Sequence, residues 1–373
     1  MATLEEKIKL LEQQILDERQ KLSADRMDIS FGEIMNLYEQ SELIIRPEYQ
    51  RLFRWTNTQK TLLIESILMG IPIPPIFVAE DENGVWELVD GLQRVSTIIS
   101  FFGKLKPESV QNHELSDVLE DFVSNSNKWE LEAGDIIKDL EGFDVDTLPQ
   151  KYKLNIKRAA CRVEILRGES NTSLKYELFK RLNSGGTKLT PQEIRNAVYR
   201  GINPDLNELI TELSQNSDFK ALTSLSETKI RELYDQELIL RFVAFYQNVE
   251  NINLSTQSFL DKFMEKTTST GNLDSEMYRG IFNSTIKLLT EIGDNTIFRN
   301  ERNLFVPAVF EGVMIGISEN LDYYTNHQDE LQEKIRRLQT DDEFKRLSGS
   351  ASNSRSRVKK RLQRAQEIFS YEN

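Results

Sequence analysis

The sequence has 373 residues, of which 39% are hydrophobic, and its formal net charge is −13 at pH 7. The length predicts two or three domains, and a chain this acidic contacts phosphate only through a local basic patch. A single cysteine excludes an intrachain disulfide, and two isolated histidines argue against a Cys/His zinc site and a His-Asn-His nuclease core.

Three further expectations come from the composition. Cys161 lies in the apolar run "AACRVEIL", and we expect it to be a small buried hydrophobe. The N-terminus is charged throughout, which argues against a secretory signal. No apolar run approaches the roughly 20 residues of a membrane helix, so we expect a cytoplasmic protein with no membrane segment.

Residues 1–25 are predicted to form an N-terminal heptad helix. Its apolar residues follow a spacing of 4, 3, 4 and 7, with Glu18 in the remaining position of the seam. These residues are Leu4, Ile8, Leu11, Ile15 and Leu22. The pattern fits an amphipathic helix packed on its own domain, and it fits equally a short coiled coil with a partner protein or a second copy.

Two capping-box spacings predict the next helices. Ser30 with Glu33 places a helix start near residue 31, and Thr56 with Gln59 places another near residue 57. The second helix is expected to end at Gly70, with proline beyond it.

Residues 74–91 read as a β-hairpin, because two strand-like runs flank the turn pair Asn83-Gly84. A helix then runs to Gly103. Residues 104–150 are acidic and weakly patterned, which indicates a loop-rich insertion.

A strand is predicted over 158–166 and a helix over 172–182. Thr190 and Glu193 then form a third capping box, with Pro191 at the first helical position. From residue 202 onward the pattern is helical almost everywhere. The sequence therefore predicts an α+β protein, with a mixed domain over 26–200 and an all-helical domain over 201–373.

The stretch "VDGLQRVSTI" carries the first candidate site. A strand that ends in Asp90-Gly91 and enters a helix aims free backbone N–H groups at the turn, and such an end attracts phosphate. Gln93, Arg94 and Thr97 lie within reach; Arg94 can donate to phosphate oxygens, and Asp90 can hold Mg²⁺. The alternative is structural: Asp90 caps the helix and Arg94 pairs with a carboxylate.

Two other stretches carry similar chemistry. "RPEYQRLFRW" interleaves arginines with aromatics, which suits phosphate contact and base stacking, although a core-facing aromatic set fits as well. "RLNSGGTKLTPQE" places small residues before a helix, as a phosphate cradle or as a flexible turn. The candidate ligand contacts here are Tyr49, Gln50, Arg51, Arg54, Asn183, Gly185 and Gly186.

The last helix combines an apolar stripe with a basic run. Val358, Leu362, Ala365 and Phe369 are spaced to dock one face. The remaining faces carry candidate contacts to a DNA backbone, or basic residues that pair with the chain's own acids. These residues are Arg355, Arg357, Lys359, Lys360, Arg361 and Arg364.

The order "PEYQRLFRW", "VDGLQRVSTI" and "FKRLNSGGTKLTPQEIRNA" resembles the domain of unknown function 262 over about residues 28–200. This is the N-terminal module of GmrSD-type modification-dependent restriction systems, related to the ParB/sulfiredoxin fold. The family's usual Asp-Gly-Gln-Gln-Arg motif reads Asp-Gly-Leu-Gln-Arg here, so that Leu92 replaces one amide.

The resemblance implies a nucleotide site in which Asp90, Gln93 and Arg94 are catalytic, with Tyr49 and Arg51 in the same pocket. It further implies GTP or ATP with Mg²⁺ as ligands, and coupling to DNA cleavage or to sensing of modified DNA. Because the chain has no His-Asn-His domain, the resemblance implies that a separate nuclease or effector would cleave the DNA.

Three functions remain open at this point. The first is a nucleotide-responsive or modified-DNA-sensing module of an antiphage restriction-type defence system. The second is a metal-dependent DNA nuclease in its own right, with Asp90 and Glu87 or another acid as ligands. The third is a non-catalytic adaptor with a decayed nucleotide site, whose binding element is the heptad helix.

Overall fold

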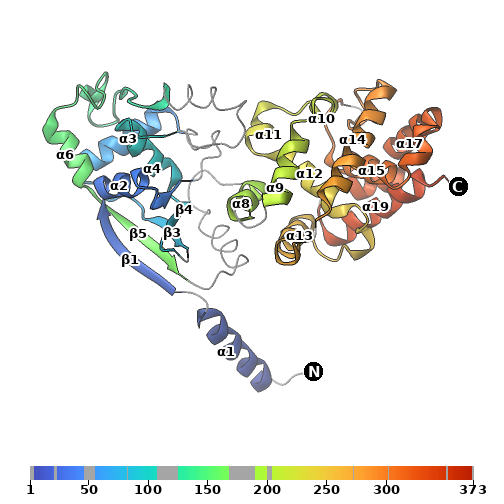
Figure 1. Cartoon of the computed structure of the whole chain (residues 1–373), viewed down its shortest axis with the longest axis horizontal. Helices are drawn as coiled ribbons and strands as arrows, with labels where there is room; N and C mark the ends of the chain where they lie inside the picture. The colour runs from blue at the N-terminus through green and yellow to red at the C-terminus, as the bar shows by residue number, and fades with distance from the viewer. Residues whose placement is uncertain are drawn as a thin grey trace. The chain divides into compact units, whose positions relative to one another are not determined.

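The computed structural model describes residues 4–20, 23–45, 55–81, 83–106, 125–167, 190–199, 204–271, 273–300, 302–349 and 352–371 (Figure 1). These residues form two compact units, and each is described by itself. The described residues up to 167 belong to the first unit, and those from 190 onward belong to the second. Residues 190–199, at the end of the predicted mixed domain, thus belong to the helical unit.

The first unit contains a five-stranded mixed sheet with the strand order β1-β5-β3-β4-β2. The strands are β1 (Ser23–Ser30), β2 (Leu43–Ile44), β3 (Ile76–Glu80), β4 (Trp86–Asp90) and β5 (Ala160–Arg167). Strand β5 pairs antiparallel with β1 and parallel with β3, the hairpin joins β3 to β4, and β2 pairs parallel with β4. With the helical second unit, this confirms the α+β class; the ParB/sulfiredoxin relation stays a prediction.

Two helices of the first unit begin where the predicted caps place them. Ser30 Oγ accepts the Glu33 N–H at 3.1 Å, and Thr56 with Gln59 makes a complete capping box. Each cap satisfies helix N–H groups that have no partner within the helix. The helices are α1 (Leu4–Gln20), α2 (Phe31–Glu39), α3 (Asn57–Leu68), α4 (Leu92–Phe101), the 3-10 turn η1 (Lys138–Leu140) and α6 (Gln150–Arg158).

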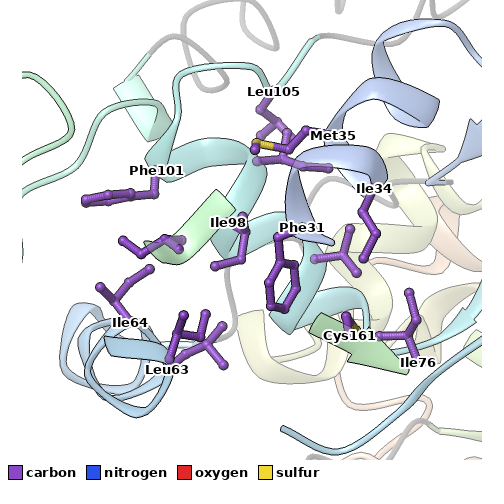
Figure 2. Packing of buried hydrophobic residues seen from close by; sticks show 14 of the residues in the cluster. Phe31, Ile34, Met35, Leu63, Ile64, Ile76, Ile98, Phe101, Leu105 and Cys161 are labelled. Atoms are coloured by element: carbon purple, nitrogen blue, oxygen red, sulfur yellow. The ribbon is translucent and has the colours of Figure 1, made fainter. Parts of the chain in front are cut away.

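One hydrophobic core joins the sheet to α2, α3, α4 and α6 (Figure 2). Phe31 and Ile34 from α2 and Ile98 from α4 pack with Ile76 from β3 and Cys161 from β5. Cys161 is 1% exposed and has no disulfide partner, which confirms that it is a small buried hydrophobe; its burial raises the pKa of the thiol to about 11.

The loop-rich insertion packs on this core in its described part, residues 125–150. Trp129 and Leu131 are buried, and Trp129 Nε1 donates to Ser100 Oγ at 3.1 Å. The buried carboxylate of Glu65 accepts the N–H groups of Ile136 and Ile137 at 2.9 and 2.6 Å. Such bonds tie an irregular segment to helix α3 by satisfying its buried backbone donors.

The second unit is helical, as predicted. Its helices are α8 (Pro191–Tyr199), α9 (Pro204–Ser214), α10 (Ser217–Thr223), α11 (Glu227–Arg231), α12 (Tyr234–Phe245), α13 (Thr256–Thr270), α14 (Ser275–Ile292), α15 (Pro307–Ser318), α16 (Leu321–Thr325), α17 (Gln328–Thr340), α18 (Asp342–Ser348) and α19 (Arg355–Phe369), with a 3-10 turn η2 (Val249–Asn251). Thr190 and Glu193 form the expected capping box at α8.

Helices α12 and α15 are buried along most of their length and form the centre of this unit. Helix α19 docks on α15 through Val358, Leu362, Ala365 and Phe369, all of them fully buried, as the apolar stripe predicts. Within the described part of the chain, no helix combines the length and apolar character that crossing a membrane requires.

Candidate functional site at the strand to helix junction

The junction of β4 and α4 is built around Gly91. This residue is the N-cap of α4 and has φ = +99°, a left-handed conformation that favours glycine. A Cβ at this position would lie 2.5 Å from Cγ2 of Ile76 and 3.2 Å from Nη2 of Arg94. Glycine is therefore required by the close packing of the chain's own side chains, in addition to any approach by a ligand.

Arg94 folds back on the junction. Its Nη2 donates to Oδ2 of Asp90 and to the carbonyl of Pro75, both at 3.1 Å. The side chains are 16% exposed at Arg94 and 32% exposed at Asp90, so the ion pair is partly open to solvent. This is the carboxylate pairing of the structural alternative. The other half of that alternative is absent, because no side chain caps α4.

One nitrogen of the Arg94 guanidinium lacks a partner. Nε is buried, and no hydrogen-bond acceptor of the described residues reaches it. A buried donor without a partner costs about 1–3 kcal/mol, more when the group is charged. An oxygen of a bound anion at this nitrogen would remove that cost.

Gln93 joins two of the sequence motifs. Its Oε1 accepts the backbone N–H of Trp55 at 3.2 Å, and Trp55 packs against the core of the first unit. Trp55 is the last residue of "PEYQRLFRW", so the end of that stretch is fixed at the start of α4. The other predicted residues of that stretch, Tyr49, Gln50, Arg51 and Arg54, lie outside the described residues, and so do Asn183, Gly185 and Gly186.

Thr97 lies away from the junction's open side. It is only 2% exposed, in the part of α4 that faces the core. A ligand at the Asp90–Arg94 pair would reach this hydroxyl only after the core had opened.

The hairpin has an irregular register at the site. Asp90 pairs with Phe77 and Leu88 with Val78, so Val89 is an extra residue on β4. Glu87 pairs with Ala79, two residues from Phe77 on β3, and side chains two apart in a strand share a face. The bulge therefore places Asp90 and Glu87 on one face of the sheet.

The carboxylates at the junction provide few ligands for a divalent cation. Mg²⁺ is often held by one or two carboxylates together with water and substrate phosphates, and Asp90 with Glu87 meets the lower limit. Within the described residues there is no group of three or more acidic, histidine or cysteine side chains that could hold a metal ion. A cation at Asp90 would also compete with Arg94 for the same carboxylate.

Sequence reasoning missed the backbone groups at this junction. The Pro75 carbonyl and the Trp55 N–H have no residue-type signature, and they lie 19 and 38 residues from the side chains they bind.

The basic residues of α19 have different environments. Arg361 is 1% exposed, and its guanidinium bonds to the buried carboxylate of Glu311, so it faces the interior instead of a DNA backbone. Arg364 pairs with Asp341 and Glu367, and hydrogen bonds to these carboxylates raise the pKa of Arg364. Of the other four predicted contacts, Arg355 and Lys360 are exposed, and Arg357 and Lys359 are half-buried.

Three of these four line a surface hollow of about 330 Å³. They are Arg355, Lys359 and Lys360, and Glu250 lies beside them. Lys359 Nζ is 2.9 Å from a Glu250 carboxylate oxygen, so one positive charge of the hollow is already neutralised.

Comparison with known protein families gives one result for the first half of the chain. Residues 31–200 match the family described as GmrSD restriction endonuclease, N-terminal domain. The match covers the Trp55, Asp90–Arg94 and Asn183–Gly186 stretches, and it confirms the resemblance seen in the sequence. Residues 31–200 are a GmrSD-type N-terminal domain, which associates the chain with restriction-type defence. No curated protein sequence matches the chain.

Proposed function

We propose that this chain, through its GmrSD-type N-terminal domain, is a nucleotide-responsive or modified-DNA-sensing module of an antiphage restriction system, and that a separate nuclease or effector cuts. One observation carries the proposal. At the β4–α4 junction, Arg94 is held by Asp90 and Pro75 and keeps a buried Nε without an acceptor. The missing partner of Nε is a hydrogen-bond acceptor, and a negatively charged phosphate oxygen is a strong acceptor for a guanidinium N–H.

Within this proposal the residues have separate roles. Arg94 binds a phosphate oxygen, and the α4 N-terminus behind Gly91 adds the positive end of the helix dipole. Gln93, through Trp55, relays the state of the site to the preceding stretch. Asp90 either keeps Arg94 in place or gives it up to hold Mg²⁺ beside GTP or ATP. Because Leu92 replaces a glutamine of the family motif, any hydrolysis of the nucleotide would proceed without that side-chain amide.

Ligand-dependent thermal stabilisation tests the proposal. The purified chain is melted with GTP, with ATP and with oligonucleotides that carry modified bases, each with and without Mg²⁺. A ligand at 100 times its Kd stabilises a site by about 2.7 kcal/mol. We expect stabilisation of the wild type and its loss in Arg94→Ala.

Arg162→Ala is the matched control. Arg162 lies on β5 in the same unit, and its Nε pairs at 3.1 Å with Asp28 of the edge strand β1, where both side chains are exposed. This variant removes the same charge away from the junction and should respond to ligand as the wild type does. If no ligand stabilises the wild type, or if both variants lose the response equally, the junction is not the binding site.

A metal-dependent nuclease is the second candidate, and the β4 bulge favours it because it places Asp90 and Glu87 on one face of the sheet. Two carboxylates and a phosphate oxygen would bind Mg²⁺ or Mn²⁺ for phosphodiester hydrolysis. Cleavage of plain or modified plasmid that is lost in both Asp90→Asn and Glu87→Gln would select this function. Intact plasmid under all metal conditions would reject it.

A further inference from the structure

Helix α1 leaves its apolar residues uncovered. All its described side chains from Leu4 to Asp17 are exposed, and the four seam residues are 46–74% exposed. These are Leu4, Ile8, Leu11 and Ile15. Isolated helices of about this length are marginal in water, and most helix stability comes from burying an apolar face. The seam therefore needs a partner surface.

The identity of the seam residues indicates what that partner is. With Leu4 at heptad position d, Ile8 and Ile15 fall at position a and Leu11 at position d. Isoleucine at a with leucine at d favours a parallel, two-stranded coiled coil. Leu10 and Leu16 are also exposed, but they fall at positions c and b, outside the seam.

The flanking charges agree with this orientation. Lys7 is at position g and Glu12 at the e position of the next heptad. In a parallel pair, these two positions face each other across the helices, so each Lys7 meets Glu12 of the second copy. An antiparallel pair on the same four layers would instead bring Glu5 close to Glu12 of the second copy, and these charges repel.

We propose that residues 4–20 bind a second copy of this chain as a parallel two-stranded coiled coil. Glu18 occupies a d position and interrupts the seam after four layers, so the association is weak and depends on concentration. The dimer would bring the first units of two chains together at their N-terminal ends. It does not depend on the ligand proposed for the β4–α4 junction.

Sedimentation equilibrium of the full chain over a concentration series tests the pairing. We expect the wild type to dimerise and Ile8→Glu with Ile15→Glu to weaken the dimer at least tenfold. The matched control is Leu10→Glu with Leu16→Glu, which adds the same charge to the same helix outside the seam and should dimerise as the wild type does. A wild type that stays monomeric, or equal weakening in both double variants, would overturn the proposal.

Two further measurements test the orientation. Leu4→Cys should give a disulfide-linked dimer on mild oxidation, because parallel d positions lie within disulfide reach; the native Cys161 is buried and does not compete. Lys7→Glu and Glu12→Lys should each weaken the dimer, and the double exchange should restore it. Absence of the cross-link, or no recovery in the exchanged protein, would reject the parallel arrangement.

Discussion

Glu311 is the centre of a buried ionic network in the helical unit, and its neutralisation should destabilise that unit strongly. The side chain is 1% exposed, on α15. It accepts hydrogen bonds from Arg241 of α12 and from Arg361 of α19, the latter with Nε at 3.1 Å. Burial alone would raise the pKa of Glu311, but the charges of Arg361 and Arg241 outweigh it and hold that pKa below its ordinary value.

The magnitude of Glu311→Gln follows from the partners that remain. Removing one member of a buried ion pair costs about 3–5 kcal/mol, because the other charge stays buried without compensation. Arg241 keeps Glu237, with Nη2 at 2.6 Å from its carboxylate, whereas the acceptor left to Arg361 among the described residues is the carbonyl of Ser352. We therefore expect a loss near the lower limit, about 3 kcal/mol. For a unit of this size, that lowers Tm by about 6–12 °C.

Hydrogen exchange of the α15 and α19 amides measures this loss in the full chain, because exchange reports the opening of the helical unit alone. Glu250→Gln is the control, since Glu250 pairs with Lys359 at the exposed end of α19, where an ion pair contributes little. The folded-state pKa of Glu311 is depressed, so its contribution is complete above the ordinary glutamate pKa and is lost as pH falls through the folded value. A Glu311→Gln loss no larger than that of the control, or one that does not change at acid pH, would refute the reasoning.

Three further outcomes are expected. Gly91→Ala should destabilise the first unit by about 2–4 kcal/mol in urea unfolding, because the added methyl group meets Ile76. Gly84→Ala is the control: Gly84 also has a positive φ, but no atom lies within 4 Å of its added Cβ, so this change should cost less. Cys161 should react with a thiol reagent only as fast as the first unit opens, since its side chain is 1% exposed; burial also raises the pKa of the thiol to about 11, which reduces its reactivity further. Burial raises the pKa of Asp235, which favours its protonated form in the folded state, so Asp235→Asn should raise thermal stability at pH 7 and give a smaller gain below pH 4.

The elements that could be predicted from sequence are those fixed by local chemistry. The helix starts after Ser30, Thr56 and Thr190 follow from caps whose partners are three residues away. The Asn83-Gly84 hairpin follows from a turn that needs positive φ, and Gly84 has φ = +80°. In each case, the interacting groups lie within one turn of the chain.

Strand β1 could not be predicted in this way. Its sequence, "SADRMDIS", is polar, and it becomes a strand because β5 lies 130 residues or more downstream and supplies both a ladder and charged partners. Arg26 pairs with Glu164 at 2.9 Å, and Asp28 pairs with Arg162. Charged residues on an edge strand also block further strand addition, so its polar pattern reflects its place in the sheet.

In the candidate site, the local contacts could be predicted from sequence, and the contacts to distant segments could not. Asp90, Gly91 and Arg94 lie together because only four residues of chain span the junction of β4 and α4, so the pair of Asp90 and Arg94 is a local feature. The Pro75 carbonyl and the Trp55 N–H depend on how distant segments fold back. At Arg361 the local pattern gave a wrong prediction. The basic run indicated an exposed side chain, but Arg361 is buried and bonds to Glu311, which lies 50 residues away in the sequence.

The buried charges of the helical unit also explain why the end of the family match packs with this unit. Arg195, in the matched "TPQEIRNA" stretch, is fully buried and bonds to Asp261 of α13 at 2.7 Å, and it lies 3.5 Å from Glu237 of α12. Glu237 binds Arg241, which binds Glu311, which binds Arg361 of α19. Helix α8 is therefore attached by charge to α12 and α13, and through them to α19. Because a buried guanidinium without its carboxylates is costly, α8, the last helix of the matched range, requires the rest of the helical unit for its fold.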